Sequence, residues 1–433
     1  MVMEKVIAQG LIDFLYNSPT AFQAVENIEE ILELKGFKEL KENEKWHLEP
    51  KGKYFVTKNN SAIVAFQIGS GDLSEYGFKI IGAHTDSPGF RIKPNSDITV
   101  ENTYIKLNTE VYGGPILNTW FDRPLALAGR VTLLSDNPLK PINKFINIKK
   151  PILIIPNLAI HMNREINEGV KIDRQKDTLP LLALVKETLE KNNYLLNLLA
   201  QELGCERTNI LDFELCPYEF EKGCLMGLNN EFISAGRLDN LAMVHAGIKA
   251  LIDTEANLAT NIMMCFDNEE VGSSTKQGGD SNFLSIVLER INIALGKNRE
   301  DFFRALAESF MISADLAHAV HPNKGEMHDP TVRPVLNGGP VIKIAASQSY
   351  TSDSDSSAVY EAICRRAGVN VQKFVNRSDL RGGSTIGPIS STHLPIRSVD
   401  IGTPILAMHS IRELGTVKDH CDCIKSFEEF YKL

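Results

Sequence analysis

The sequence predicts an α/β fold in which a mixed, mainly parallel sheet carries helices on both faces and is interrupted by an inserted, mainly β domain. Three observations support this prediction. The chain of 433 residues is too long for one simple core. Strand-like and helical patterns alternate in its outer parts, and the middle region has a different texture. We therefore expect one domain over residues 1–92 and 234–433 and an inserted domain over residues 93–233.

The first part of the chain predicts helices followed by buried strands. Apolar residues recur at helical spacing as far as Phe14, and again from Ala24 to Leu32. Two apolar, strand-like runs follow, from Ser61 to Ile68 and from Phe78 to Gly82. The second run leads directly into a histidine and an aspartate.

The middle region predicts antiparallel strands with one helix. Alternating apolar and polar residues mark Thr103 to Val111, Gly129 to Leu134 and Leu211 to Leu215. A leucine-rich stretch from Leu195 to Leu203 has helical spacing. None of the acid and histidine clusters described below falls in this region, which favours a separate, inserted domain.

After Gly236 the strand and helix patterns alternate again. Asn261 to Phe266 and Val341 to Ala346 predict buried strands, and Thr351 to Arg366 and Val417 to Tyr431 predict helices. This alternation is the pattern of a sheet whose parallel strands are joined by covering helices.

Composition narrows the class of protein. The formal net charge of -9 argues against a nucleic-acid partner, whose usual footprint is a basic face. No segment predicts a membrane span, and Glu4, Lys5 and Asp13 interrupt the apolar residues that a signal peptide would need. The seven cysteines are scattered without framework spacing, so we expect reduced thiols and a cytoplasmic location.

A histidine and an aspartate follow the strand predicted at Phe78 to Gly82. A metal-bound histidine usually donates its second ring N–H to an acceptor, and Asp86 stands two residues after His84. The alternative is an ordinary strand end with two polar loop residues.

Two adjacent glutamates follow the next buried strand. Placing Glu269 and Glu270 at the end of an apolar strand costs free energy unless a cation or a catalytic use compensates. The alternative is a solvated, acidic loop, although the Val271-Gly272 pair after them indicates a tight turn.

Three further segments repeat this arrangement. Asp315 and His409 end apolar runs, and Asp239 precedes a helical pattern, where simple capping is its alternative role. Ligands of open α/β sheets bind at the carboxyl ends of strands. Two histidines with three carboxylates suit a pair of zinc-like ions and leave one carboxylate for catalysis.

Five of these segments resemble the aspartyl aminopeptidase family. They occur in that family's order and cover the chain from about residue 80 to 415: His84–Pro88, Gly236–Asn240, Asp267–Ser273, Ser313–Asn323 and Met408–Glu413. The resemblance implies a metallo-aminopeptidase with a dimerisation domain inserted into the catalytic domain. It also implies a cis peptide after the bridging aspartate, between Asp239 and Asn240.

The same resemblance implies roles for single residues. His84 and Asp315 would hold one metal ion, Glu270 and His409 would hold the other, and Asp239 would bridge them. Among the remaining acids, Glu269 would be the general base and Asp86 would orient His84. Zinc is the expected metal, with cobalt and manganese as alternatives for such ligands.

Substrate selection is implied for two residues. Lys343 lies in a segment similar to the one whose lysine faces the substrate side chain, and Met408 precedes His409 in the fifth motif. Such a lysine would favour N-terminal Asp or Glu, but the alternative is a strand lysine that points to solvent. The expected substrates are short peptides.

The inserted domain is implied to complete the site of a second subunit. Pro156 to Arg164 looks like the family segment that reaches into the partner's active site, and His161 would donate a hydrogen bond there. The alternative is a buried or capping histidine. The resemblance further implies a homododecamer, built from six dimers as a tetrahedral shell.

Two other functions stay open at this point. The ligand set alone would also suit another two-metal amidohydrolase, such as a carboxypeptidase or a deacylase. A catalytically inactive member kept as an assembly module would usually lack a ligand or the base, and this sequence lacks none of them.

Overall fold

The structure is a computed structural model that describes residues 2–185, 193–380 and 382–433. The chain forms two compact units. Unit 1 comprises the chain up to Asp86 together with Gly223–Met408 and Glu413–Leu433. Unit 2 comprises Ser87–Lys222 and the short segment His409–Arg412.

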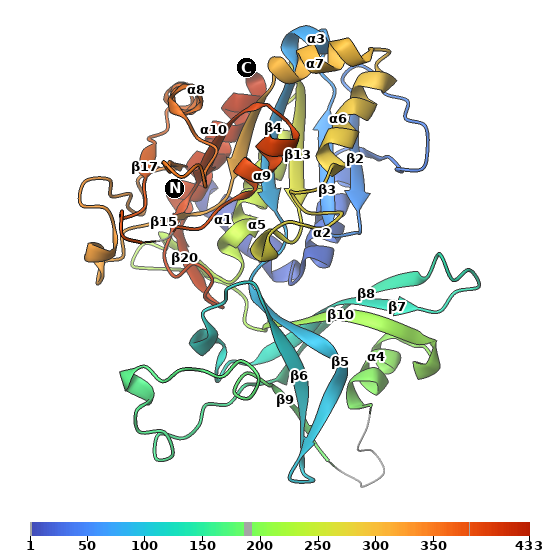
Figure 1. Ribbon diagram of the computed structural model, residues 1–433, viewed down its shortest axis with the longest axis vertical. Coiled ribbons are helices and arrows are strands. Elements are labelled where there is room, and N and C mark those ends of the chain that lie inside the picture. Colours follow the sequence, from blue (N-terminus) through green and yellow to red (C-terminus); the bar gives the residue numbers. More distant parts are fainter. Residues whose placement is uncertain (1, 186–192, 381) are drawn as a thin grey trace. The chain divides into compact units, whose positions relative to one another are not determined.

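Within the described residues, unit 1 is built on a nine-stranded sheet with the order β1-β2-β3-β13-β4-β14-β18-β16-β17 (Figure 1). The pairs β1–β2, β13–β4, β4–β14, β14–β18 and β16–β17 are parallel, and the other three are antiparallel. The predicted mixed, mainly parallel sheet is therefore confirmed. Its strands are β1 (Lys38–Glu39), β2 (Lys53–Lys58), β3 (Ala62–Gln67), β4 (Phe78–His84), β13 (Thr260–Phe266), β14 (Phe310–Ala314), β16 (Val341–Lys343), β17 (Gln372–Phe374) and β18 (Arg397–Gly402).

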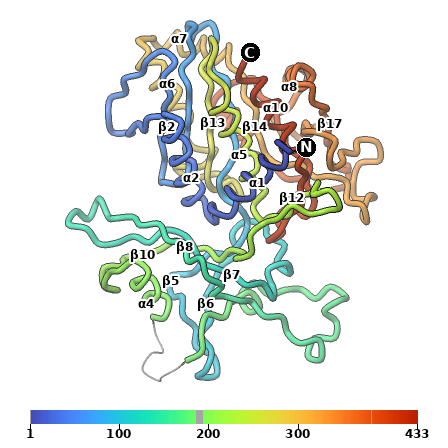
Figure 2. The backbone as a smooth tube through the Cα atoms, turned by 180° about the vertical axis from the view of Figure 1, so that it is seen from behind, coloured from blue at the N-terminus to red at the C-terminus, as the bar shows by residue number. Residues whose placement is uncertain are grey.

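Both faces of this sheet are covered, because successive side chains of a strand point to opposite faces. In β3, Ile63 and Ala65 belong to one apolar core, and Val64 and Phe66 belong to the other. Helices α1, α2, α5, α8 and α10 contribute to the first core, and α6, α7 and α9 to the second. Figures 1 and 2 show these two helical layers from opposite sides.

Several of these helices start at side chains that accept backbone N–H groups. Asp353 forms a capping box with Ser356 at the start of α8, and Thr416 caps α10. The cap explains why α8 starts three residues later than predicted. The helices of unit 1 are α1 (Val2–Asn17), α2 (Ala21–Leu34), α3 (Leu73–Tyr76), α5 (Leu238–Asp253), α6 (Phe283–Ala294), α7 (Arg299–Ala307), α8 (Ser354–Ala367), α9 (Ile386–His393) and α10 (Val417–Lys432), with 3-10 turns at Glu269–Val271 and Gly325–Met327.

Two small sheets complete the description of unit 1. One has the order β11-β12-β20 and the other pairs β15 with β19. Their strands are β11 (Cys224–Met226), β12 (Phe232–Ala235), β20 (Glu413–Thr416), β15 (Ala317–His318) and β19 (Pro404–Ile405).

Unit 2 is mainly β, as the texture of the middle region predicts. Among its described residues, two three-stranded sheets have the orders β10-β7-β8 and β5-β6-β9, and all their pairs are antiparallel. Leu195 and Leu199 of helix α4 (Tyr194–Leu203) pack into its apolar core. The elements are β5 (Gly89–Val100), β6 (Tyr104–Tyr112), β7 (Leu125–Leu133), β8 (Ile142–Leu153), β9 (Leu181–Leu184), β10 (Ile210–Glu219) and α4 (Tyr194–Leu203), with 3-10 turns at Leu117–Trp120, Ile166–Glu168 and Arg207–Asn209.

One predicted strand is too long. The prediction ran to Ala346, but β16 ends at Lys343. The Ile344 amide still donates to Phe374 O, and Gln348 N then donates to Ala345 O, so the chain turns away from the sheet. No helix in the part of the chain that the structure describes is long and apolar enough to cross a membrane.

The register of the central strands brings their carboxyl ends to one edge. Phe266 at the end of β13 pairs with His84 at the end of β4, and Ser313 in β14 pairs with Gly82 in β4. The residues that follow β13 and β14 therefore emerge beside His84.

Candidate metal centre

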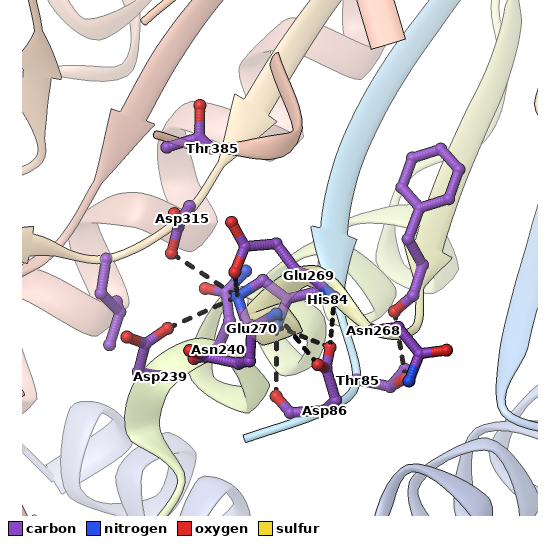
Figure 3. A network of polar contacts seen from close by, with 12 residues as sticks. His84, Thr85, Asp86, Asp239, Asn240, Asn268, Glu269, Glu270, Asp315 and Thr385 are labelled. Atoms are coloured by element: carbon purple, nitrogen blue, oxygen red, sulfur yellow. Dashed lines mark hydrogen bonds and ion pairs between the residues drawn. The ribbon is translucent and has the colours of Figure 1, made fainter. Parts of the chain in front are cut away.

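His84 is the centre of a buried group of carboxylates. Its Nε2 atom lies 3.5 Å from Asp239 Oδ1, 3.7 Å from Asp315 Oδ1 and 3.8 Å from Glu269 Oε2. Figure 3 shows these side chains converging from different segments of unit 1. The structure thus brings together residues that are 155 to 231 positions from His84 in the sequence.

The groups around His84 strongly raise its pKa. Burial lowers the pKa of His84, but hydrogen bonds to Asp239, Asp315 and Asp86 outweigh burial, so its pKa is raised well above the ordinary value. Three carboxylates gathered around one imidazole nitrogen form a strongly negative, buried environment. Such an environment favours a cation.

Asp86 holds the second ring nitrogen and the loop that carries both glutamates. Its Oδ1 atom lies 3.2 Å from His84 Nδ1, and its backbone oxygen lies 3.1 Å from the same nitrogen. The two carboxylate oxygens accept the N–H groups of Glu269 and Glu270, each at 3.1 Å. The predicted orienting contact from Asp86 to His84 is present, and Nε2 is left to face the carboxylates.

The glutamates occupy a tight turn after β13. Asn268 has a left-handed backbone (φ 61°), and its Oδ1 atom accepts hydrogen bonds from Thr275 Oγ1 at 3.0 Å and Gln277 Nε2 at 2.9 Å. Burial raises the pKa of Glu269 to about 7, although His84 opposes the shift. The turn is therefore stabilised by hydrogen bonds and is not the solvated acidic loop of the alternative interpretation.

Asp239 lies in an irregular first turn of α5. It does not cap this helix, because its carboxylate faces His84 and the cap position is Arg237. The Asp239 N–H donates to Glu413 Oε2 at 3.0 Å, and Asn240 Nδ2 donates to Ala314 O at 2.9 Å. The peptide between Asp239 and Asn240 is cis, as expected.

Lys343 is buried beside Asp315. Its Nζ atom lies 3.4 Å from Asp315 Oδ2 and donates to Leu316 O at 3.2 Å, with the Tyr350 ring centroid 5.3 Å away. Burial lowers the pKa of Lys343, but Asp315 and Asp400 outweigh it and raise the pKa above the ordinary value. The alternative of a strand lysine pointing to solvent is therefore wrong.

Three further predicted residues belong to other segments of the chain. His409 is in the segment that belongs to unit 2, four residues beyond β19, so it does not end a strand. Its Nδ1 atom lies 3.1 Å from Gly114 O. Met408 is partly buried and packs against the first core of unit 1, and His161 is exposed in unit 2.

The donor set fits a divalent metal. His84, Asp239 and Asp315 offer ligand atoms that all lie within 4.8 Å of one another, and so do His84, Glu269 and Glu270. Imidazole and carboxylate oxygen are the usual ligands of zinc where thiolates are absent. Most of these donors are buried, so a cation would replace the water that the carboxylates lose on folding.

Two contacts at this site could not be identified from the sequence alone. Glu413 appears in the fifth motif, but nothing in a linear pattern shows that its carboxylate accepts the amide of Asp239. Asn240 appears in the second motif, and its bond to Ala314 O is equally invisible there. Only their presence in the motifs marked them.

Comparison with known proteins gives one consistent result. The family model for the aminopeptidase I zinc metalloprotease (M18) matches residues 14–431. A probable M18 family aminopeptidase 2 of Clostridium novyi is 65% identical over 426 residues, which cover 98% of each chain.

Solved structures give the same result. The chain is similar to one in the Ape4 and Nbr1 complex, with a TM-score of 0.95, 38% identity and coverage of 99% of this chain and 86% of that one. It is also similar to the mApe1 dodecamer of S. cerevisiae, with a TM-score of 0.86, 28% identity and coverage of 100% and 97%.

Proposed function

The chain belongs to the aminopeptidase I zinc metalloprotease (M18) family, and we propose on this premise that it hydrolyses the N-terminal residue from peptides with two bound metal ions. The observation that carries the proposal is the convergence of Asp239, Asp315 and Glu269 on His84 Nε2. The family resemblance of the motifs assigns separate roles to these residues.

The proposed ligands divide between two ions. His84 and Asp315 would hold one ion, Glu270 and His409 would hold the other, and Asp239 would be a ligand shared by both. The short distances among His84, Asp239 and Asp315 support the first part of this assignment. Zinc is the proposed metal, with cobalt or manganese as chemically acceptable replacements.

The proposed chemistry is attack of water on the first peptide carbonyl. When bound, zinc supplies Lewis-acid polarisation and lowers the pKa of water towards ~7. Glu269 accepts a proton from the attacking water and delivers it to the nitrogen of the leaving amine as the C–N bond breaks. The distance of 3.8 Å between Glu269 Oε2 and His84 Nε2 supports this role.

The proposed substrates are short peptides with a free α-amino group, which Glu270 would help to bind. Lys343 would pair with an acidic N-terminal side chain, and Met408 would form part of the same pocket. The burial of Lys343 supports this role, because charge pairing strengthens as water is excluded. A preference for N-terminal Asp or Glu follows from it.

The proposed active assembly is a homo-oligomer built from dimers, with twelve subunits in a tetrahedral shell. The similarity to a dodecamer supports this proposal. His161 would then act on the partner subunit's substrate, and its exposed position in unit 2 is compatible with that role. All seven cysteines are free thiols, which supports a cytoplasmic location.

A substrate panel with metal removal tests the function. The purified protein should hydrolyse aminoacyl amides and peptides with a free N-terminus, lose activity with a chelator and recover it with zinc. Cleavage of N-acylated substrates, or cleavage from the C-terminus, would instead identify a deacylase or a carboxypeptidase. Zinc binding without any turnover would identify an inactive assembly module.

A further inference from the structure

The backbone of Asp239 depends on an acceptor from outside its own helix. Asp239 is the second residue of α5, so its N–H group has no acceptor within that helix. Its φ and ψ angles of -79° and 108° are not helical. Glu413 Oε2 accepts this N–H at 3.0 Å.

Glu413 is built into the fold at this position. It is 2% exposed, and it pairs with Ala235 of β12 in the β20 ladder. Burying a carboxylate costs free energy, and a hydrogen bond from a backbone amide offsets part of that cost. The ladder fixes the Glu413 backbone, so the side chain reaches Asp239 from a rigid element.

A second hydrogen bond ties the same turn to another strand. Asn240 Nδ2 donates to Ala314 O at 2.9 Å, and Ala314 directly precedes Asp315. The turn that carries Asp239 is therefore attached both to β20 and to the end of β14. The attachment through Glu413 acts on the Asp239 backbone itself.

We propose that Glu413 is a positioning residue for the metal centre. Its carboxylate holds the Asp239 amide, and this fixes the direction in which the Asp239 side chain leaves the backbone. Glu413 touches neither substrate nor metal in this role. The inference rests on the proposed function, because it requires Asp239 to be a metal ligand.

Two conservative variants distinguish the effect of the length of the Glu413 side chain from the effect of its charge. Glu413→Asp keeps the carboxylate but withdraws it by one methylene, whereas Glu413→Gln keeps the length and one acceptor oxygen. We expect the zinc dissociation constant of Glu413→Asp to rise about tenfold to a hundredfold, as for other residues that orient ligands. We expect Glu413→Gln to stay near the wild-type value. Chelator competition measures both constants.

A matched control is a buried carboxylate away from the ligands. Asp419 accepts the amides of Asn337 and Gly339, so Asp419→Asn should lower the melting temperature without weakening zinc binding. The zinc-dependent rise in melting temperature provides a second readout for a destabilised variant. An unchanged rise in Glu413→Asp, or weaker binding in Glu413→Gln than in Glu413→Asp, would overturn the inference.

The wild-type protein and Asp239→Asn distinguish the two levels of the proposal. If the wild type binds no zinc, or if Asp239→Asn leaves binding unchanged, the proposed metal centre itself is wrong. If Asp239→Asn weakens binding and Glu413→Asp does not, only the role of Glu413 is wrong.

Discussion

Two histidine environments in unit 1 shift the pKa of the imidazole in opposite directions. His84 and His420 are buried and His245 is partly buried, yet the pKa of His84 is raised and the pKa values of His245 and His420 are lowered. Carboxylates surround His84, whereas His245 lies against Phe14 and His420. Burial alone therefore opposes a cation, and the surrounding acids decide whether a histidine belongs to a metal centre.

The difference also explains a misleading pattern near the C-terminus. His420, Cys421 and Cys423 stand close together in the sequence, but His420 Nε2 lies 3.0 Å from His245 Nδ1. Among the residues that the structure describes, no potential metal group includes these three side chains. Proximity in sequence on one helix did not bring these side chains together as ligands. The distant strand ends, in contrast, bring Asp315 and Asp239 next to His84.

The largest expected effect lies in the carboxylate-rich environment. Glu269→Gln should retain zinc and lose about 10²–10⁴-fold in turnover, since that is the contribution of a general base. Glu270→Gln should instead weaken zinc binding. Steady-state kinetics and metal analysis of both variants would expose a wrong assignment if the two phenotypes were exchanged.

The exposed His161 adds a third histidine environment to the comparison. His161→Phe should reduce turnover by about 10²–10³-fold, the typical loss of one hydrogen-bond donor to a developing oxyanion. Because we propose that His161 acts across a dimer, mixing His161→Phe with Glu269→Gln should restore some activity.

The control for that mixture uses two variants on the same side of the interface. Glu269→Gln and Glu270→Gln should not restore activity when mixed, because neither supplies an intact catalytic site. If the first mixture also stays inactive after proven subunit exchange, His161 does not act in trans.

A smaller effect is expected when the environment of His84 loses one charge. Asp86→Asn should weaken zinc binding about tenfold to a hundredfold, because Asp86 orients His84 and holds the glutamate loop. Chelator competition measures this change. Asp267→Asn is a suitable control, since Asp267 is also buried but accepts the Asn268 amide; equal losses in the two variants would argue against a specific role for Asp86.

The effect of Lys343 should appear mainly in selectivity. Lys343→Met should lower the preference for N-terminal Asp or Glu over neutral residues by about tenfold, equivalent to about 1.4 kcal/mol. The ratio of kcat/KM values at equal zinc content measures this preference. Lys373→Met on the neighbouring strand, where the lysine pairs with Glu361, should leave the ratio unchanged. An absent acidic preference in the wild type would remove the proposed role.

The smallest effect on activity is expected for the pair His245 and His420. This pair should instead affect the pH dependence of the protein's stability. Removal from water lowers the pKa of His245 to about 4, so the unfolded chain binds a proton more readily than the folded one. This contribution is complete above pH ~6.5 and is lost as the pH falls towards 4. The doubly substituted His245→Gln, His420→Gln protein should show a weaker loss of urea resistance between pH 7.5 and 5. If both proteins lost the same amount of urea resistance between pH 7.5 and 5, the histidine pair would not be the source of this pH dependence.

The sequence was sufficient for the architecture and for most of the acid and histidine cluster. The apolar runs before His84 and Asp315 predicted strands whose parallel register brings those residues together. The backbone around His409 was not predicted, because the residues after β19 take left-handed angles at Ala407 and at His409 itself. A local pattern does not reveal such a loop, since its conformation depends on contacts such as that with Gly114.

Side-chain-to-backbone contacts were the least predictable part. Glu413 and Asp239 are 174 residues apart, and their hydrogen bond depends on the pairing of β20 with β12. The burial of Lys343 likewise depends on where β16 ends beside Asp315. These features follow from tertiary packing, which cannot be read from composition and periodicity.

The two carboxylate oxygens of Asp86 contact three groups: the His84 ring and the backbone amides of Glu269 and Glu270. Because Oδ1 and Oδ2 hold the Glu269 and Glu270 amides while Oδ1 also faces His84, these positions form an epistatic unit. Substitutions in such a unit do not add independently. Mutational drift or laboratory selection that alters position 86 would therefore change the consequences of every later substitution at the glutamates, so the order in which changes arise matters for this enzyme's evolution.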